Sequence, residues 1–151
     1  MFSSPSETAD FAVRLGAALD PGDCILLSGP IGAGKSHFAR HLIQSRMTEP
    51  EDVPSPTFTL VQVYDLPECE LWHADLYRLS SLDEIDELGL TEAWDTAISL
   101  IEWPDRLAET APTSALSIDL SLDPELEDAR RAALTWTDPK WVKKLEFAHD
   151  V

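Results

Sequence analysis

The stretch ILLSGPIGAGKSHFARHLI, residues 25–43, constrains the fold of this chain more than any other part of the sequence. A short apolar run is followed directly by a turn with three glycines and then by an amphipathic segment. A wholly apolar run of this length is typical of a strand buried on both faces of a parallel sheet. The apolar residues after the turn recur at helical spacing. The stretch therefore predicts a buried strand, a tight turn and a helix.

The turn itself, GPIGAGKS at residues 29–36, fits the pattern G-x-x-x-x-G-K-[ST] at every position. Its glycines allow backbone N–H groups to point inward and form an anion nest at a helix N-terminus. Lys35 would reach the β and γ phosphates, and the hydroxyl of Ser36 would ligate magnesium. The alternative is a glycine-rich turn with an incidental lysine, but the flanking strand and helix favour a loop that binds a nucleoside triphosphate. The expected cofactor-binding residues are Gly29, Gly32, Ala33, Gly34, Lys35 and Ser36.

Two further segments predict a β-hairpin. Residues 57–64 (TFTLVQVY) are β-branched and aromatic, and residues 70–75 (ELWHAD) read as a second strand. Only five residues separate them, which is too few for a parallel crossover. We therefore expect these two strands to pair antiparallel.

The remaining strands follow from apolar patterning. Residues 97–102 (AISLIE) form an apolar run that Pro104 ends, and residues 116–122 alternate strictly between apolar and polar. Leu134 and Trp136 continue that alternation in a partner strand. Together these segments predict a single domain over residues 1–151, an α/β three-layer sandwich like those of P-loop NTPases. Its mixed sheet would be parallel in the centre and antiparallel at the edges.

Helices are predicted by caps and by helical spacing. Ser4 and Glu7 form a capping box around a proline and open a helix that ends near residue 20. A second capping box opens a short helix at residues 81–89, and Thr91 is expected to cap another. Trp141 and Leu145 mark the apolar side of a final helix.

Two carboxylates follow apolar strands at the sheet edge where ligands bind in such folds. Glu102 ends ISLIE, which favours a place in the site over that of an ordinary strand-end acid. Asp75 ends LWHAD, where spacing alone leaves both interpretations open. His73 lies on the same strand face, and a hydrogen-bonded structural histidine is as consistent with its position as a catalytic one.

Three residues near these acids carry weaker signals. Thr57 and Thr59 could offer a hydroxyl to magnesium or to the γ-phosphate, although threonine is common in strands for its β-propensity. Arg78 is the one cation close in sequence to the acids, and it would pair either with phosphate or with Asp83 or Glu84.

The charge composition limits the kinds of partner that the chain can bind. The chain has 28 acidic and 11 basic residues and a net charge of −17, which opposes direct binding of nucleic acid. Such acidity suits a basic protein partner, or it serves solubility alone. Cys24 and Cys69 lack the spacing of a zinc site or a disulfide framework. No signal peptide and no apolar run long enough to cross a bilayer occur in the sequence, so we expect a cytoplasmic protein without a membrane partner.

Five motifs occur in a recognisable order: SGPIGAGKS, SPTFTLVQVY, HADLYRL, ELGL and LIEWPDRL. In this order and spacing the sequence resembles the TsaE family, small P-loop ATPases of the bacterial pathway that makes threonylcarbamoyladenosine beside the tRNA anticodon. The resemblance covers about residues 22–107. It implies ATP and Mg²⁺ as cofactors and the TsaB and TsaD subunits as partners, whose complex the ATP cycle would reset. Contact with tRNA would occur only through that complex.

The resemblance also implies roles for particular residues. Ser36 with Glu102 or Asp75 would hold magnesium, and Asp75 and Glu102 would be the catalytic acids. Residues 55–58, which include Thr57, would act as a switch-like loop over the γ-phosphate. Trp103 would lie near the nucleotide.

One position departs from the family pattern, which usually reads Gly-Asp-Leu-Gly-Ala-Gly-Lys-Thr. Ser36 replaces the threonine and can ligate magnesium in the same way. Pro30 stands where the family carries aspartate, and it removes both a carboxylate and a backbone N–H from the loop. Any role of that aspartate is therefore in doubt in this chain.

Two other classes of protein compete with an ATPase subunit. A small-molecule kinase usually carries an arginine-bearing lid after the central strands, and only Arg106, Arg130 and Arg131 lie downstream here. A sensor that binds ATP without hydrolysing it would share every binding residue and differ only at Asp75 and Glu102. A GTPase is disfavoured because the sequence has no N/T-K-x-D motif.

Overall fold

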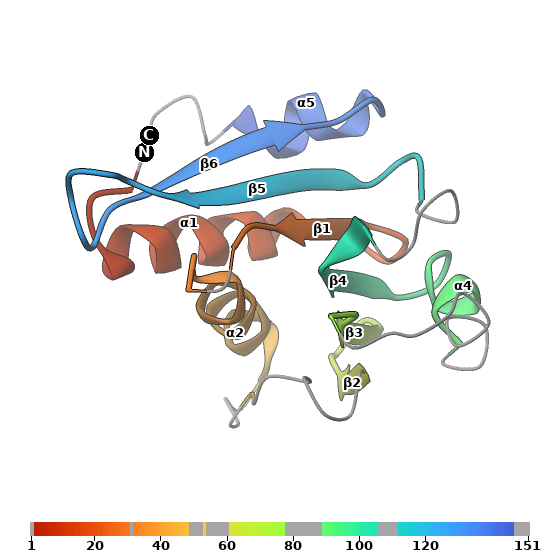
Figure 1. Ribbon diagram of the computed structural model, residues 1–151. Coiled ribbons are helices and arrows are strands. Elements are labelled where there is room, and N and C mark those ends of the chain that lie inside the picture. Colours follow the sequence, from red (N-terminus) through yellow and green to blue (C-terminus); the bar gives the residue numbers. More distant parts are fainter. Residues whose placement is uncertain are drawn as a thin grey trace.

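The computed structural model describes residues 2–30, 32–48, 53, 61–77, 89–105 and 112–146. Within these residues six strands form one sheet in the order β2-β3-β4-β1-β5-β6 (Figure 1). The strands are β1 (Cys24–Ser28), β2 (Val61–Asp65), β3 (Glu70–Asp75), β4 (Ile98–Glu102), β5 (Leu116–Leu122) and β6 (Arg130–Thr135). The helices are α1 (Pro5–Ala18), α2 (Lys35–Arg46), α4 (Leu90–Ala93) and α5 (Lys140–Lys144).

The sheet is mixed, as the sequence predicts. β1 lies in the centre and pairs parallel with β4 and β5, and β3 pairs parallel with β4. The edge strands β2 and β6 pair antiparallel with β3 and β5. The predicted hairpin is therefore confirmed from Val61 onward, whereas residues 57–60 lie outside the described residues. The carboxyl ends of β1, β3 and β4 meet at one edge of the sheet, because these strands run parallel.

Helices cover both faces of the sheet, which explains why β1 and β4 are mostly apolar. On one face, α1, α2 and α5 pack in one cluster with strand residues such as Leu27, Leu100 and Ile118. On the other face, Leu90 of α4 packs with Leu26 and Ile101. Burial on both sides leaves no solvent-facing position for polar residues in these strands. No helix of the described residues is long and apolar enough to cross a bilayer.

The helix ends show where local sequence rules hold and where they fail. Ser4 caps α1, and its hydroxyl accepts a hydrogen bond from the Glu7 N–H at 3.3 Å. The Glu7 carboxylate in turn accepts from the Ser3 N–H, one residue earlier than in a standard capping box. The prediction that Thr91 caps a helix is wrong. Gly89 caps α4 with φ +81°, a conformation that favours glycine, and Thr91 lies inside the helix.

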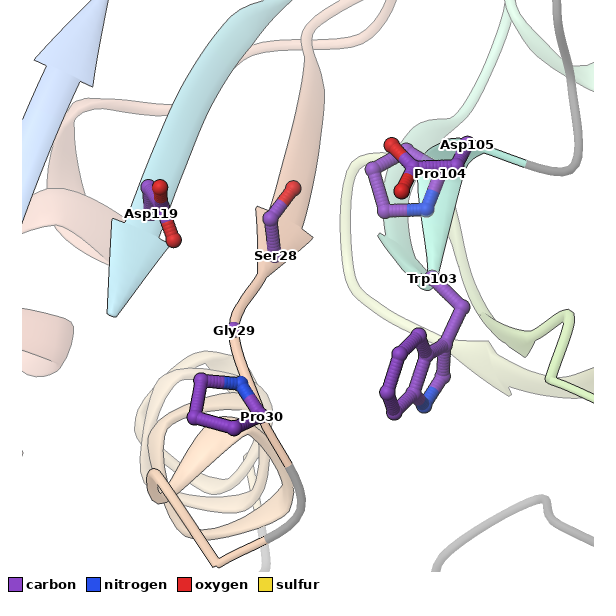
Figure 2. Close-up of a pocket in the computed structure, with 7 residues that line it drawn as sticks. All are labelled: Ser28, Gly29, Pro30, Trp103, Pro104, Asp105 and Asp119. Carbon is purple, nitrogen blue, oxygen red and sulfur yellow. The ribbon is translucent and has the colours of Figure 1, made fainter. Parts of the chain in front are cut away.

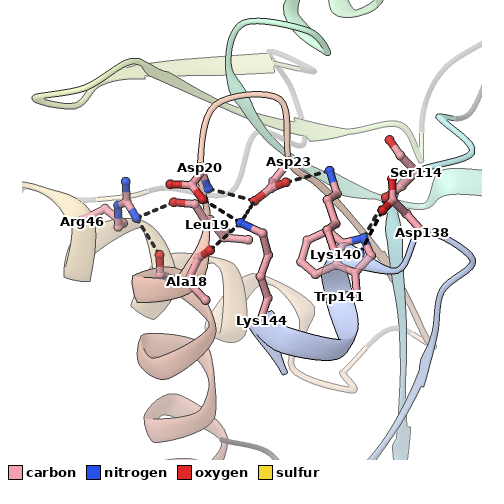
Figure 3. A network of polar contacts seen from close by, with 11 residues as sticks. Ala18, Leu19, Asp20, Asp23, Arg46, Ser114, Asp138, Lys140, Trp141 and Lys144 are labelled. Carbon is pink, nitrogen blue, oxygen red and sulfur yellow. Dashed lines mark hydrogen bonds and ion pairs between the residues drawn. The ribbon is translucent and has the colours of Figure 1, made fainter. Parts of the chain in front are cut away.

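A network of charges ties α5 to the turn between α1 and β1 (Figure 3). The Asp23 side chain is only 4% exposed, and its two oxygens lie 2.8 Å from the ammonium groups of Lys140 and Lys144. Lys144 also contacts Asp20 at 2.8 Å and donates to the Ala18 carbonyl at 2.9 Å. The network therefore joins three elements at the edge of the sheet where β1 begins, opposite the glycine-rich turn.

Replacement of Asp23 by asparagine is expected to lower the free energy of unfolding by about 2 kcal/mol, because two partly buried ammonium groups lose their carboxylate. Burial alone would raise the pKa of Asp23, but hydrogen bonds from Lys140 and Lys144 hold that pKa below its ordinary value of 3.8. The folded state thus binds this proton less readily than the unfolded state. The carboxylate's contribution is fully present above the unfolded pKa and is lost as the pH falls through the folded pKa.

Urea unfolding at a series of pH values from neutral to acidic measures both effects. Asp20→Asn is the matched control, because the Asp20 side chain is 78% exposed and shares only Lys144. We expect a loss well under 1 kcal/mol for this control. Equal losses for the two variants would contradict the assignment of Asp23 as the centre of the network.

Candidate functional site

The glycine-rich turn joins the carboxyl end of β1 to the first residue of α2, as the sequence predicts. Gly34 caps α2 with φ +99°, in the left-handed region that side chains rarely adopt. Gly29 lies against β5, where an added Cβ would overlap the carbonyl oxygen of Leu120. Gly34 is thus required for its conformation, and Gly29, which has φ +143°, is required for both its conformation and its close packing.

Lys35 is buried at the base of this turn, with 6% of its surface exposed. Its ammonium group donates hydrogen bonds to the carbonyl of Gly29 and, at 3.3 Å, to that of Pro30. The same group lies 3.9 Å from the centroid of the Trp103 ring, which is a cation–π contact. Burial lowers the pKa of Lys35, and the charges of Glu102 and Asp75 oppose that shift. The lysine is therefore held between the turn, an aromatic ring and two carboxylates.

Strand register brings the two predicted acids to the same edge as the turn. Asp75 on β3 lies directly opposite Glu102 on β4, and Glu102 lies opposite Leu27 on β1. Both carboxylate residues are buried, at 5% and 2% exposure. The Ser36 hydroxyl donates to Glu102 Oε1 at 3.3 Å. The Tyr77 N–H donates to Asp75 Oδ1 at 3.1 Å.

His73 contacts the other oxygen of Glu102. Its Nε2 lies 2.6 Å from Oε2, and both side chains are almost fully buried. The carboxylate form of Glu102 can only accept, and in that form the proton of this contact is carried by Nε2. Within the described part of the chain, Nδ1 has no hydrogen-bond partner. This geometry favours the structural interpretation of His73, as a residue that orients Glu102 toward Ser36.

Trp103 adopts φ +59°, which is strained for a bulky side chain. Its backbone N–H donates to the Leu27 carbonyl at 3.2 Å, and its ring packs on Tyr77 with centroids 4.8 Å apart. These contacts hold the indole over Lys35. That Trp103 lies near a nucleotide stays a prediction.

A cleft of about 380 Å³ adjoins the turn. Figure 2 shows Pro30 and Trp103 on opposite sides of it. Its polar lining comes from Ser28 at the end of β1, Asp119 in the middle of β5 and Asp105, which follows β4. The sequence does not single these residues out as members of a site. Two carboxylates therefore line the same cleft as Pro30, at whose position the family pattern has an aspartate.

The donor set near the turn suits magnesium. The Ser36 hydroxyl and the carboxylates of Glu102 and Asp75 are hard oxygen ligands, which Mg²⁺ prefers. Among the described residues, no three or more His, Cys, Asp or Glu side chains are arranged to hold a metal by themselves. Where phosphate oxygens and water complete the coordination of Mg²⁺, a protein usually supplies only one or two ligands.

Some predicted residues cannot be placed. Thr57, the rest of residues 55–58, Thr59, Arg78 and Arg106 lie outside the described residues. One residue near the turn was not anticipated as part of it. Arg130 of β6 donates to the carbonyls of Ala33 at 3.2 Å and Gly32 at 3.4 Å.

A buried parallel strand, a G-x-x-x-x-G-K-S turn at a helix N-terminus and a carboxylate on the adjacent strand place this protein in the P-loop NTPase-like class of folds. A family model described as threonylcarbamoyl adenosine biosynthesis protein TsaE matches residues 2–132. The chain belongs to the TsaE family.

Individual relatives agree with this assignment. The chain is 40% identical over 131 residues to tRNA threonylcarbamoyladenosine biosynthesis protein TsaE of Rickettsia bellii, covering 87% of this chain and 89% of the relative. It is 34% identical over 116 residues to the protein of that name in Bacillus subtilis, covering 76% and 72%. The crystal structure of YdiB from Bacillus subtilis superposes with a TM-score of 0.75 and 27% identity, covering 98% of this chain and 92% of YdiB.

Proposed function

We propose that this chain binds Mg-ATP at the turn of residues 29–36 and hydrolyses it in the service of tRNA threonylcarbamoyladenosine biosynthesis. The observation that carries the proposal is the convergence of Lys35, Ser36 and Glu102 at one edge of the sheet. A buried ammonium, a hydroxyl and a carboxylate 3.3 Å from that hydroxyl are the groups needed to bind a triphosphate with its magnesium. The family membership supplies the pathway.

Each residue then has a physical task. The backbone N–H groups of the turn and the ammonium of Lys35 would bind the β and γ phosphates. Ser36, with Glu102 or Asp75, would hold Mg²⁺, which neutralises charge as it develops on the phosphate oxygens. The second carboxylate would orient the attacking water, and His73 would keep Glu102 in place through the 2.6 Å contact. Trp103 would cover Lys35 and limit access of water to it.

The proposed partners are subunits of the TsaB and TsaD type, with tRNA reached only through their complex. A net charge of −17 supports docking on basic protein surfaces and opposes independent binding of tRNA. The proposed place of action is the cytoplasm, where tRNA is modified.

The function is tested in a bacterial strain depleted of its own TsaE-family protein. We expect this chain to restore threonylcarbamoyladenosine in bulk tRNA, measured by mass spectrometry of nucleosides, and the Lys35→Ala variant to fail at equal expression. Equal restoration by the variant would overturn the requirement for nucleotide binding. Failure of the unmodified chain to restore the nucleoside would overturn the proposed place in the pathway.

A further inference from the structure

Arg130 reaches the phosphate-binding turn from the opposite end of the sequence. It is the first residue of β6, yet its guanidinium donates from Nε to the Ala33 carbonyl at 3.2 Å and from Nη2 to the Gly32 carbonyl at 3.4 Å. Its Nη1 donates to the carbonyls of Glu127 and Ala129 at 2.8 and 2.9 Å. The planar guanidinium thus joins the turn to the hairpin between β5 and β6.

The backbone of Arg130 is itself firmly anchored. Its N–H and carbonyl exchange hydrogen bonds with Phe2 at 2.8 and 2.7 Å. The Phe2 ring packs on Phe11 of α1, and Phe11 packs on Phe38 of α2, with centroids 5.2 and 6.1 Å apart. Because α2 follows the turn directly, the anchor of Arg130 and the helix after the turn belong to one packed unit. Arg130 therefore binds the turn through its side chain while its backbone is held in place by Phe2.

The guanidinium of Arg130 pairs with backbone carbonyls rather than with a carboxylate, although the chain is strongly acidic. In the described parts of the chain no carboxylate lies within ion-pair distance of Arg130, whereas its neighbour Arg131 pairs with Asp123 at 3.3 Å. The guanidinium instead draws the Gly32 and Ala33 carbonyls toward itself. A peptide plane is rigid, so fixing the Ala33 carbonyl also fixes the Gly34 N–H, which points the other way. Orientation of N–H groups is what an anion nest requires.

We propose that Arg130 is a positioning residue that fixes the turn at Gly32 and Ala33 and so prepares its N–H groups for phosphate. The consequence for nucleotide affinity rests on the proposed function, whereas the effect on the turn does not. A purely structural arginine would stabilise the hairpin through Glu127 and Ala129 without changing the turn. The two roles are therefore separable by measuring the turn directly.

The test compares Arg130→Gln and Arg130→Lys with Arg131→Gln, which removes the same charge from the adjacent residue of β6. Amide hydrogen exchange of residues 32–36 is measured without ligand, together with the Kd of a fluorescent ATP analogue and the melting temperature. For Arg130→Gln we expect exchange in the turn about tenfold faster and a Kd about tenfold weaker, because two charge-assisted hydrogen bonds are lost. For Arg130→Lys, exchange in the turn and the Kd should lie between those of the unmodified chain and of Arg130→Gln. One ammonium group cannot reach both carbonyls as the planar guanidinium does. For Arg131→Gln, exchange in the turn and the Kd should equal those of the unmodified chain.

Two results would overturn the inference. One is exchange in the turn of Arg130→Gln equal to that of Arg131→Gln. The other is a rise in exchange spread equally over the β5–β6 hairpin and the turn, which would show a general structural role. If the unmodified chain binds no nucleotide analogue while the turn alone exchanges faster in Arg130→Gln, the proposed function fails and the positioning of the turn stands.

Discussion

Lys35→Ala is expected to weaken ATP binding by at least about a hundredfold, the largest effect of any single substitution in this chain. The ammonium is buried at the base of the turn, where the charges of two carboxylates otherwise repel a triphosphate. Loss of a charged partner in a site from which water is largely excluded costs several kcal/mol, which corresponds to two or more orders of magnitude in Kd. Isothermal titration calorimetry with Mg-ATP measures the change.

Lys143→Ala is the matched control for this substitution. Lys143 is exposed on α5, so the variant makes the same change in net charge away from the turn. We expect its Kd to stay within about twofold of the unmodified chain, since exposed charges are screened by salt. Equal affinity of the Lys35→Ala and Lys143→Ala variants for Mg-ATP would show that the turn is not the phosphate site.

Asp75→Asn is expected to leave ATP binding within a few-fold and to lower turnover by at least about a hundredfold. Asparagine keeps an oxygen that can accept the 3.1 Å hydrogen bond from the Tyr77 N–H, so the local backbone should be preserved. It removes the charge needed to hold magnesium or to orient water. Single-turnover phosphate release at saturating Mg-ATP, with partner subunits present, separates this defect from any change in binding.

Asp65→Asn controls for the loss of a carboxylate on the hairpin. Asp65 is exposed at the end of β2, paired in register with Glu70 and remote from the carboxyl end of β3. Its turnover should equal that of the unmodified chain. Normal turnover by Asp75→Asn would transfer the catalytic assignment to Glu102 alone.

The parts of the site formed by residues close together in the chain could be predicted from the sequence. The turn requires consecutive residues of fixed type, and alternation along β3 already places His73 and Asp75 on one face. Strand directions also followed, since a five-residue connection allows only an antiparallel pair. Thr91 shows the limit of cap rules, because Gly89 reaches a backbone conformation that threonine disfavours and begins the helix earlier.

The long-range parts could not be predicted, because they depend on register and on side-chain reach. His73 contacts Glu102 only because β3 and β4 align Asp75 with Glu102, a pairing that no spacing in the chain encodes. Arg130 is 97 positions from Ala33, and strand alternation does not say how far a long side chain extends. The cleft lining of Asp105 and Asp119 depends on the same sheet geometry.

The central claim, that this chain hydrolyses ATP for a tRNA-modifying complex, is tested most directly by its ATP consumption. The rate is measured for the chain alone and after addition of TsaB-type and TsaD-type subunits and tRNA. We predict slow turnover alone and stimulation of about tenfold or more in the full mixture, abolished by Asp75→Asn. A rate in the full mixture no higher than that of the lone chain would contradict the claim and favour a sensor that binds ATP without hydrolysing it.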